Sequence, residues 1–217
     1  MRTFVALVPP AAVIDELATA LAPVQADHAD LRWTPSGQWH LTLAFLGEID
    51  EGVLPDLTER LARAARRHPT LDLALGGAGR FGDRVLWTRV LAAPDIEPDR
   101  PAAGPGRRPG RSAVDALRAL AATVGAAARR SRIAVDDRPY RPHLTLARGR
   151  PGTDLRPAVE ALQGFVGTPW TADALHLVRS RLGAGPGGTA AHEVIETWPL
   201  GRPPAPPAPA NGPFDGT

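Results

Sequence analysis

Apolar residues along the chain follow two spacings, and each spacing predicts a different kind of element. Short apolar or alternating runs predict strands over residues 4–8, 39–46, 71–75, 85–91, 143–147, 174–180 and 192–198. Apolar residues three and four positions apart predict helices over residues 11–26, 53–67, 114–130 and 155–162. We expect the glycine-rich run 76–79 to connect two of the strands. Strands and helices do not alternate regularly, which favours an α+β fold with largely antiparallel sheets over a doubly wound parallel sheet.

Two proline-rich segments interrupt this pattern. Residues 94–111 contain five prolines and three glycines, and residues 199–217 contain seven prolines. Neither has hydrophobic periodicity, so the sequence predicts a flexible insertion at 94–111 and a disordered tail at 201–217. We therefore expect one domain over 1–200, built from blocks of comparable size at 1–93 and 112–200.

Composition removes several classes of function. The 217 residues include no cysteine, which excludes thiol nucleophiles and cysteine-bound metals, and all 25 basic residues are arginine. Without lysine there is no Schiff base and no P-loop. The net charge of +2 is too small to indicate nucleic-acid binding by itself. Apolar runs fall short of the roughly 20 residues that span a bilayer, and prolines interrupt the first ten residues too early for us to expect a signal peptide there. We expect a cytoplasmic protein that binds no membrane.

One tetrapeptide occurs twice, as HLTL at residues 40–43 and again at 143–146. In a strand, His40 and Thr42 share one face, while Leu41, Leu43 and Phe45 share the other. His143 and Thr145 have the same relationship. Either motif alone is more often a half-buried polar face than a functional site. The pair in matched settings favours function, because two imidazoles across a cleft form an acid–base couple and two hydroxyls can bind phosphodiester oxygens.

These motifs and their flanks resemble the two-histidine phosphoesterase superfamily, in particular the bacterial RNA 2′,3′-cyclic phosphodiesterases, also called 2′-5′ RNA ligase-like proteins. The similar stretches are RTFVAL at 2–7, WHLTLAFLGE at 39–48, RVLW at 84–87, RPYRPHLTLAR at 138–148, LVRS at 177–180 and WPL at 198–200. Where the family often carries a tyrosine near the C-terminus, this chain offers His192.

The resemblance implies two pseudo-symmetric lobes around a central cleft. It implies metal-independent, cofactor-free hydrolysis of RNA 2′,3′-cyclic phosphate ends to 2′-phosphates. His40 would be the proton donor and His143 the proton acceptor, while Thr42, Thr145 and Arg148 would bind the phosphate. Rival interpretations are 2′-5′ RNA ligation, hydrolysis of a small cyclic nucleotide, and non-catalytic binding of RNA or a nucleotide. No obligate protein partner is evident, and we expect a monomer.

Four further residues are candidate substrate contacts. Arg148 lies on the leucine side of a regular strand, although a bulge or the strand end would turn it into the cleft. Arg141 is a second candidate for binding phosphate. Phe4 and Tyr140 lie beside the motif strands and are candidates for base stacking, with core packing as the alternative. If the two histidines share the proton transfers, the rate should be bell-shaped with pH, with both limbs within a unit or two of ~6.5.

Overall fold

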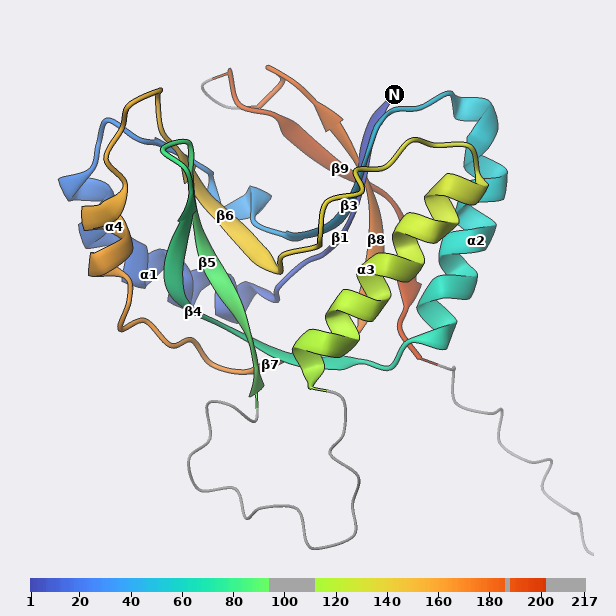
Figure 1. Ribbon diagram of the computed structural model, residues 1–217, viewed down its shortest axis with the longest axis horizontal. Coiled ribbons are helices and arrows are strands. Elements are labelled where there is room, and N and C mark those ends of the chain that lie inside the picture. The colour runs from blue at the N-terminus through green and yellow to red at the C-terminus, as the bar shows by residue number, and fades with distance from the viewer. Residues whose placement is uncertain (94–111, 186–187, 202–217) are drawn as a thin grey trace, which may run out of the picture.

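Two antiparallel sheets form the framework of the protein (Figure 1). The computed structural model describes residues 1–93, 112–185 and 188–201. The expected insertion at 94–111 and residues 202–217 of the expected tail lie outside the described residues. The elements are β1 (Arg2–Leu7), α1 (Ala11–Asp27), β2 (Arg32–Trp33), η1 (Ser36–Gln38), β3 (Leu41–Glu48), η2 (Glu51–Val53), α2 (Leu54–Arg67), β4 (Leu71–Phe81), β5 (Val85–Ala92), α3 (Ala113–Arg130), β6 (His143–Arg148), α4 (Arg156–Ala161), β7 (Trp170–Ala172), β8 (Ala174–Arg181) and β9 (Ala191–Pro199).

The α+β architecture with antiparallel sheets is confirmed, and all four predicted helices are present. The expected glycine-rich connection at 76–79 is wrong, because these residues lie inside β4 and the turn to β5 falls at 82–84. A bulge at Gly77, whose φ is +58°, accommodates the run within the strand. The sequence pattern missed β2 and β7, which are too short to show a period.

Each sheet takes strands from both halves of the sequence. One has the order β3-β1-β8-β9, and the other has the order β2-β6-β5-β4-β7. Blocks 1–93 and 112–200 therefore do not build one sheet each. The two motif strands, β3 and β6, belong to different sheets and are in contact with each other.

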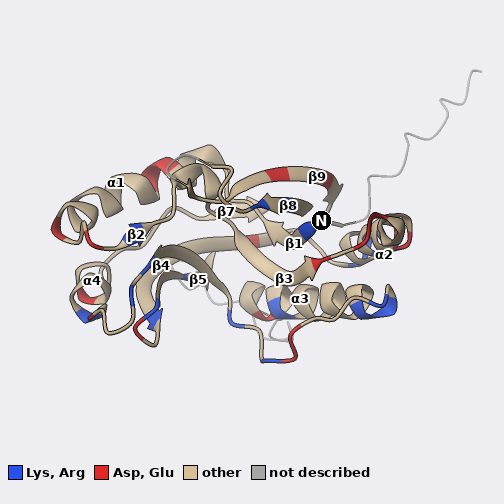
Figure 2. Cartoon of the chain, turned by 90° about the horizontal axis from the view of Figure 1, so that it is seen from above, with Lys and Arg blue, Asp and Glu red and all other residues tan. Residues whose placement is uncertain are grey.

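Leucine-rich faces of the helices and sheets share one apolar core. Helix α1 buries Leu17 and Leu21, and α3 buries Leu117 and Leu120, at the spacing of a single helical face. Helices α2 and α3 pack together beside the four-stranded sheet (Figure 1). Basic and acidic residues both occur along α2 and α3, as Figure 2 shows. Within the described residues, no helix combines the length and apolar character needed to cross a membrane.

Candidate functional site

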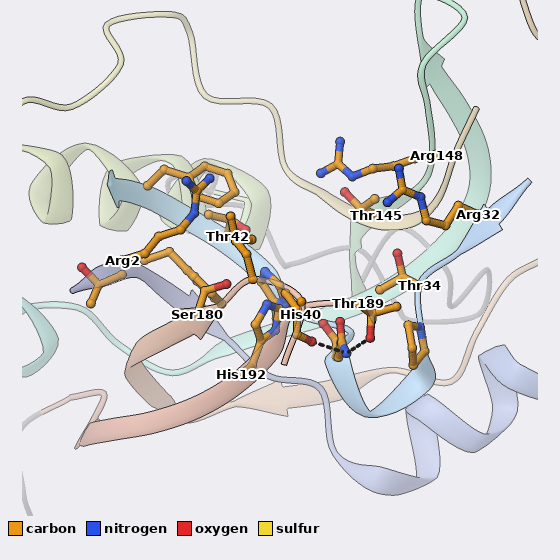
Figure 3. A pocket seen from close by; sticks show the side chains of 18 of the residues that line it. Arg2, Arg32, Thr34, His40, Thr42, Thr145, Arg148, Ser180, Thr189 and His192 are labelled. Atoms are coloured by element: carbon orange, nitrogen blue, oxygen red, sulfur yellow. Dashed lines mark hydrogen bonds between the residues drawn. The ribbon is translucent and has the colours of Figure 1, made fainter. Parts of the chain in front are cut away.

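A cavity of about 490 Å³ lies where β3 and β6 meet. Its lining includes both histidines and both threonines of the repeated motif, together with Arg148 and Phe4. Three arginines line it in all, and none of its described lining residues is acidic. The cavity is therefore suited to an anion. Figure 3 shows the labelled side chains projecting into it from both sheets.

Both motif histidines are held in the same way. The Nδ1 atom of His40 lies 2.7 Å from the backbone oxygen of Gln38, and Nδ1 of His143 lies 2.6 Å from the backbone oxygen of Arg141. A carbonyl oxygen only accepts, so each Nδ1 carries a proton and donates it. In the neutral form of each ring, Nε2 is then the atom with a free lone pair. The backbone two residues upstream thus leaves both rings able to exchange a proton through Nε2.

Aromatic rings pack against both histidines. His40 stacks on Phe4 with ring centroids 4.5 Å apart, and the ring of His192 meets His40 edge-on at 5.2 Å. His143 is flanked by Phe81 at 4.9 Å and Trp87 at 6.1 Å. These contacts restrict the rotation of each imidazole.

A glycine on β4 makes room for the Trp87 ring. A Cβ atom at Gly79 would lie 2.3 Å from two ring carbons of Trp87. Only glycine at this position therefore lets the indole lie against β4 and reach His143.

Burial of the histidines lowers their affinity for protons. Desolvation lowers the pKa of His40 to about 4, and the charges of His192 and His143 act in the same direction, although the bond to Gln38 opposes them. Desolvation also lowers the pKa of His143, with a smaller contribution from Arg148, and it lowers the pKa of His192. The value for His40 lies further from 6.5 than the sequence led us to expect.

Matching β-bulges follow the two motifs. Opposite β1, Ala6 pairs with Thr42 and Val5 with Ala44, so Leu43 is an extra residue on β3. Opposite β5, Trp87 pairs with Thr145 and Leu86 with Ala147. The extra residue on β6 is therefore Leu146.

Each bulge inverts the alternation of faces beyond it. Phe45 and Arg148, each five residues after its histidine, consequently line the cavity. The bulge resolves the placement of Arg148 in favour of the cleft. The expectation that Phe45 lies on the leucine face is wrong for the same reason.

The sequence matches the 2′-5′ RNA ligase superfamily model over residues 8–184. The chain belongs to this superfamily.

Proteins named RNA 2′,3′-cyclic phosphodiesterase are similar in sequence to much of this chain. It is 32% identical over 188 residues to the protein of that name from Thermus thermophilus, covering 84% of this chain and 83% of the relative. It is 30% identical over 175 residues to the one from Geobacillus stearothermophilus, covering 77% of this chain. The matches cover 47% of the Geobacillus relative and 50% of one from Thermotoga maritima, so the chain spans about half the length of these two relatives.

Two solved structures have a similar fold. The crystal structure of TT0787 of Thermus thermophilus is 27% identical with a TM-score of 0.66, covering 92% of this chain and 98% of that one. The crystal structure of E. coli LigT complexed with NADP+ is 25% identical with a TM-score of 0.62, covering 92% and 97%.

Of the candidate substrate contacts, Phe4 lines the cavity, whereas Tyr140 and Arg141 lie outside its lining. Tyr140 packs against the core and is absent from the cavity lining, so its alternative role in core packing holds. Burial raises the pKa of its hydroxyl. Arg141 is exposed outside the cavity lining and orients His143 through its backbone. Phe4 lines the cavity but is only 3% exposed, because it lies beneath His40.

Several cavity residues had no clear signal in the sequence. Arg2, Arg32 and Phe45 line the cavity, and Phe45 is 58% exposed. Only the pairing of their strands places them there. The ring of His192 contacts both Phe4 and His40.

Gln38 joins the first motif to the β8–β9 connection. Its side-chain Nε2 donates to the backbone oxygen of Ala190 at 2.6 Å and to Oγ1 of Thr189 at 3.3 Å (Figure 3). Its own carbonyl accepts from His40. One residue thus orients a motif histidine and anchors a wall of the cavity. Within the described residues, no group of three or more His, Cys, Asp or Glu residues is placed to hold a metal ion.

Proposed function

We propose that this protein hydrolyses 2′,3′-cyclic phosphodiester ends of RNA to 2′-phosphomonoesters, without a metal, with His40 as proton donor and His143 as proton acceptor. The observation that carries the proposal is the matched orientation of the two imidazoles, whose Nδ1 atoms are both held by backbone oxygens. Binding alone needs no such pair. The names of the relatives support the choice of RNA cyclic phosphate as substrate.

The reaction requires an acid and a base on opposite sides of phosphorus. His143 accepts a proton from water at Nε2 as the water oxygen bonds to phosphorus. The bond from phosphorus to the ribose 3′ oxygen breaks, and His40 gives its Nε2 proton to that oxygen. The product keeps a phosphate on the 2′ oxygen. His143 then loses its proton to solvent and His40 regains one. His40, directly before β3, and His143, at the start of β6, are held by different sheets, which suits this geometry.

The hydroxyls and Arg148 would hold the phosphate through the reaction. Thr42 and Thr145 lie on the cavity side of the two motif strands and can donate to the non-bridging oxygens. The guanidinium of Arg148 can bind two oxygens at once. These donors are in place before the charge develops on the pentacoordinate transition state, which is the condition for strong electrostatic stabilisation.

The bound phosphate would favour the protonated form of His40. With its pKa lowered to about 4, His40 is neutral in the free protein near neutral pH. An anion within about 4–6 Å favours the charged imidazole and raises its pKa. Binding of the anionic substrate would therefore raise the pKa of His40, so that the ring is protonated and can act as an acid.

Phe45 would bind the terminal base. It is a large aromatic ring, 58% exposed, on the cavity wall. Bases stack on such rings with little dependence on sequence. Phe4, covered by His40, is not available for this contact.

The test uses a short RNA with a 2′,3′-cyclic phosphate end and phosphorus NMR of the product. We expect a 2′-phosphate, and turnover that survives exhaustive chelation. His40→Ala and His143→Ala should each lower the rate roughly 10²–10⁴-fold. His28→Ala is the matched control, because His28 lies outside the cavity lining. A 3′-phosphate product, or full activity in either motif variant, would contradict the proposal.

A further inference from the structure

Two arginines face each other across the strand pair beside the site. In the β2–β6 pairing, Arg32 lies directly opposite Arg148. The Thr34 backbone N–H donates to the Leu146 carbonyl at 2.8 Å, which continues this register by one residue. Directly opposed residues of an antiparallel pair project from the same face of the sheet, with Cβ atoms about 5 Å apart. Both side chains line the cavity, on the same side of it as Thr145 (Figure 3).

Like charges in this position repel each other unless an anion lies between them. Neither arginine forms an ion pair with any described residue, and the described cavity lining contains no carboxylate. Other arginines of the chain, such as Arg60 and Arg156, have acidic partners. Arg32 and Arg148 are thus two positive charges with no acidic partner among the described residues. Figure 2 shows a basic residue at β2.

The scissile phosphate already has one guanidinium partner in the proposed reaction. In the proposed reaction, Arg148 is assigned to the scissile phosphate with Thr145, its neighbour on β6. Arg32 is one strand further from the motif, towards the edge of the sheet. An anion bound by Arg32 would lie beside the scissile phosphate, where a second phosphate of the same substrate can reach it. In an RNA end, the group with that property is the phosphate on the 5′ oxygen of the terminal nucleoside.

We propose that Arg32 binds this second phosphate next to the scissile phosphate held by Arg148, so that the site prefers an RNA end to an isolated cyclic nucleotide. This inference rests on the proposed function and specifies its substrate class. A planar guanidinium suits the contact because it can bind two phosphate oxygens at once. The same chemistry would accept a terminal 5′-phosphomonoester or an internucleotide diester.

The experiment compares kcat/KM for three substrates with the same terminal base. These are a nucleoside 2′,3′-cyclic phosphate with a free 5′ hydroxyl, the same nucleotide with a 5′-phosphate, and a dinucleotide ending in the cyclic phosphate. We expect the last two to exceed the first by about tenfold, the lower end of what a hydrogen bond to a charged group contributes. A gain for the dinucleotide alone would attribute the preference to the extra nucleoside and overturn the proposal.

Variants identify the residue responsible. Arg32→Gln should remove the tenfold advantage of both 5′-phosphorylated substrates and change the first by less than twofold. It should also lower the salt slope for oligonucleotide binding by about 0.7. Arg2→Gln is the matched control, because Arg2 lines the same cavity on the other side (Figure 3). The advantage disappearing in Arg2→Gln but not in Arg32→Gln would refute the assignment.

Equilibrium binding separates this inference from the reaction itself. If no substrate turns over, the proposed function fails. Calorimetry with a nucleoside 2′,5′-bisphosphate and the matching 2′-monophosphate then still tests the second phosphate. Tighter binding of the bisphosphate that Arg32→Gln removes would support the inference, and equal binding of the two would overturn it.

Discussion

Replacing each of two phenylalanines with alanine tests which ring supports His40 and which one meets the proposed substrate. Phe4 is 3% exposed and stacks on His40, whereas Phe45 is 58% exposed on the cavity wall. The rings are neighbours, with centroids 6.0 Å apart. Exposure and ring contact therefore distinguish their roles.

The two alanine variants should change different quantities: Phe45→Ala should change KM, and Phe4→Ala should change stability and kcat. Phe45→Ala removes the proposed base-stacking surface, which is worth about 1–3 kcal/mol and corresponds to a rise in KM of roughly 5- to 150-fold with kcat unchanged. Its exposed ring contributes little to folding, so the melting temperature should hardly move. Phe4→Ala should destabilise the protein by about 3 kcal/mol, the low end for buried phenylalanine because the void opens to the cavity. It should also lower kcat, because His40 loses its support.

Steady-state kinetics on a short cyclic-phosphate RNA and thermal unfolding together check this prediction. Phe45→Tyr is the control and should keep KM, since it retains the aromatic face. An unchanged KM in Phe45→Ala would refute the stacking role. A Phe4→Ala protein as stable as the parent would refute the packing argument.

Three further predictions concern charge, packing and hydrogen bonding at the site. Because burial lowers the pKa values of His40 and His143, both limbs of the profile of kcat/KM against pH should lie below about 6.5. The limbs of the kcat profile should lie at higher pH, because the bound phosphate raises the pKa values of the histidines. Limbs of kcat/KM above about pH 7 would contradict the effect of burial. Gly79→Ala should lower kcat by displacing Trp87 from His143, while Gly37→Ala, with no atom near its Cβ position, should not. Thr145→Val should cost about tenfold in kcat/KM, one hydrogen bond to a charged oxygen, and a loss as large as that of His143→Ala would assign the hydroxyl a different role.

Local patterns in the sequence were enough to predict the helices and the pairing of His with Thr on one face. Thr42 and Thr145 share the cavity with their histidines because no bulge intervenes between them. The period of two fails immediately afterwards, at Leu43 and Leu146. Whether a strand accommodates an extra residue depends on its partner strand, which lies far away in the sequence.

The placement of other residues depended on tertiary contacts for similar reasons. Gly79 lies in a strand because the Trp87 ring packs against it, although a glycine run by itself resembles a turn. Tyr140 was equally compatible with stacking and packing until the core was known. Arg32 belongs to a strand of two residues, which carries no period at all.

The interleaved strand order has a consequence for how the protein is made. β1 lies between β3 and β8, so one of its edges has no partner until residues 174–181 have been synthesised. The five-stranded sheet likewise waits for β6 and β7. Such long-range pairing slows folding and leaves strand edges open to other chains in the meantime. A fragment containing only the first motif would leave those strand edges unpaired. The cavity is completed only by the last strands, since Ser180 and His192 are part of its lining.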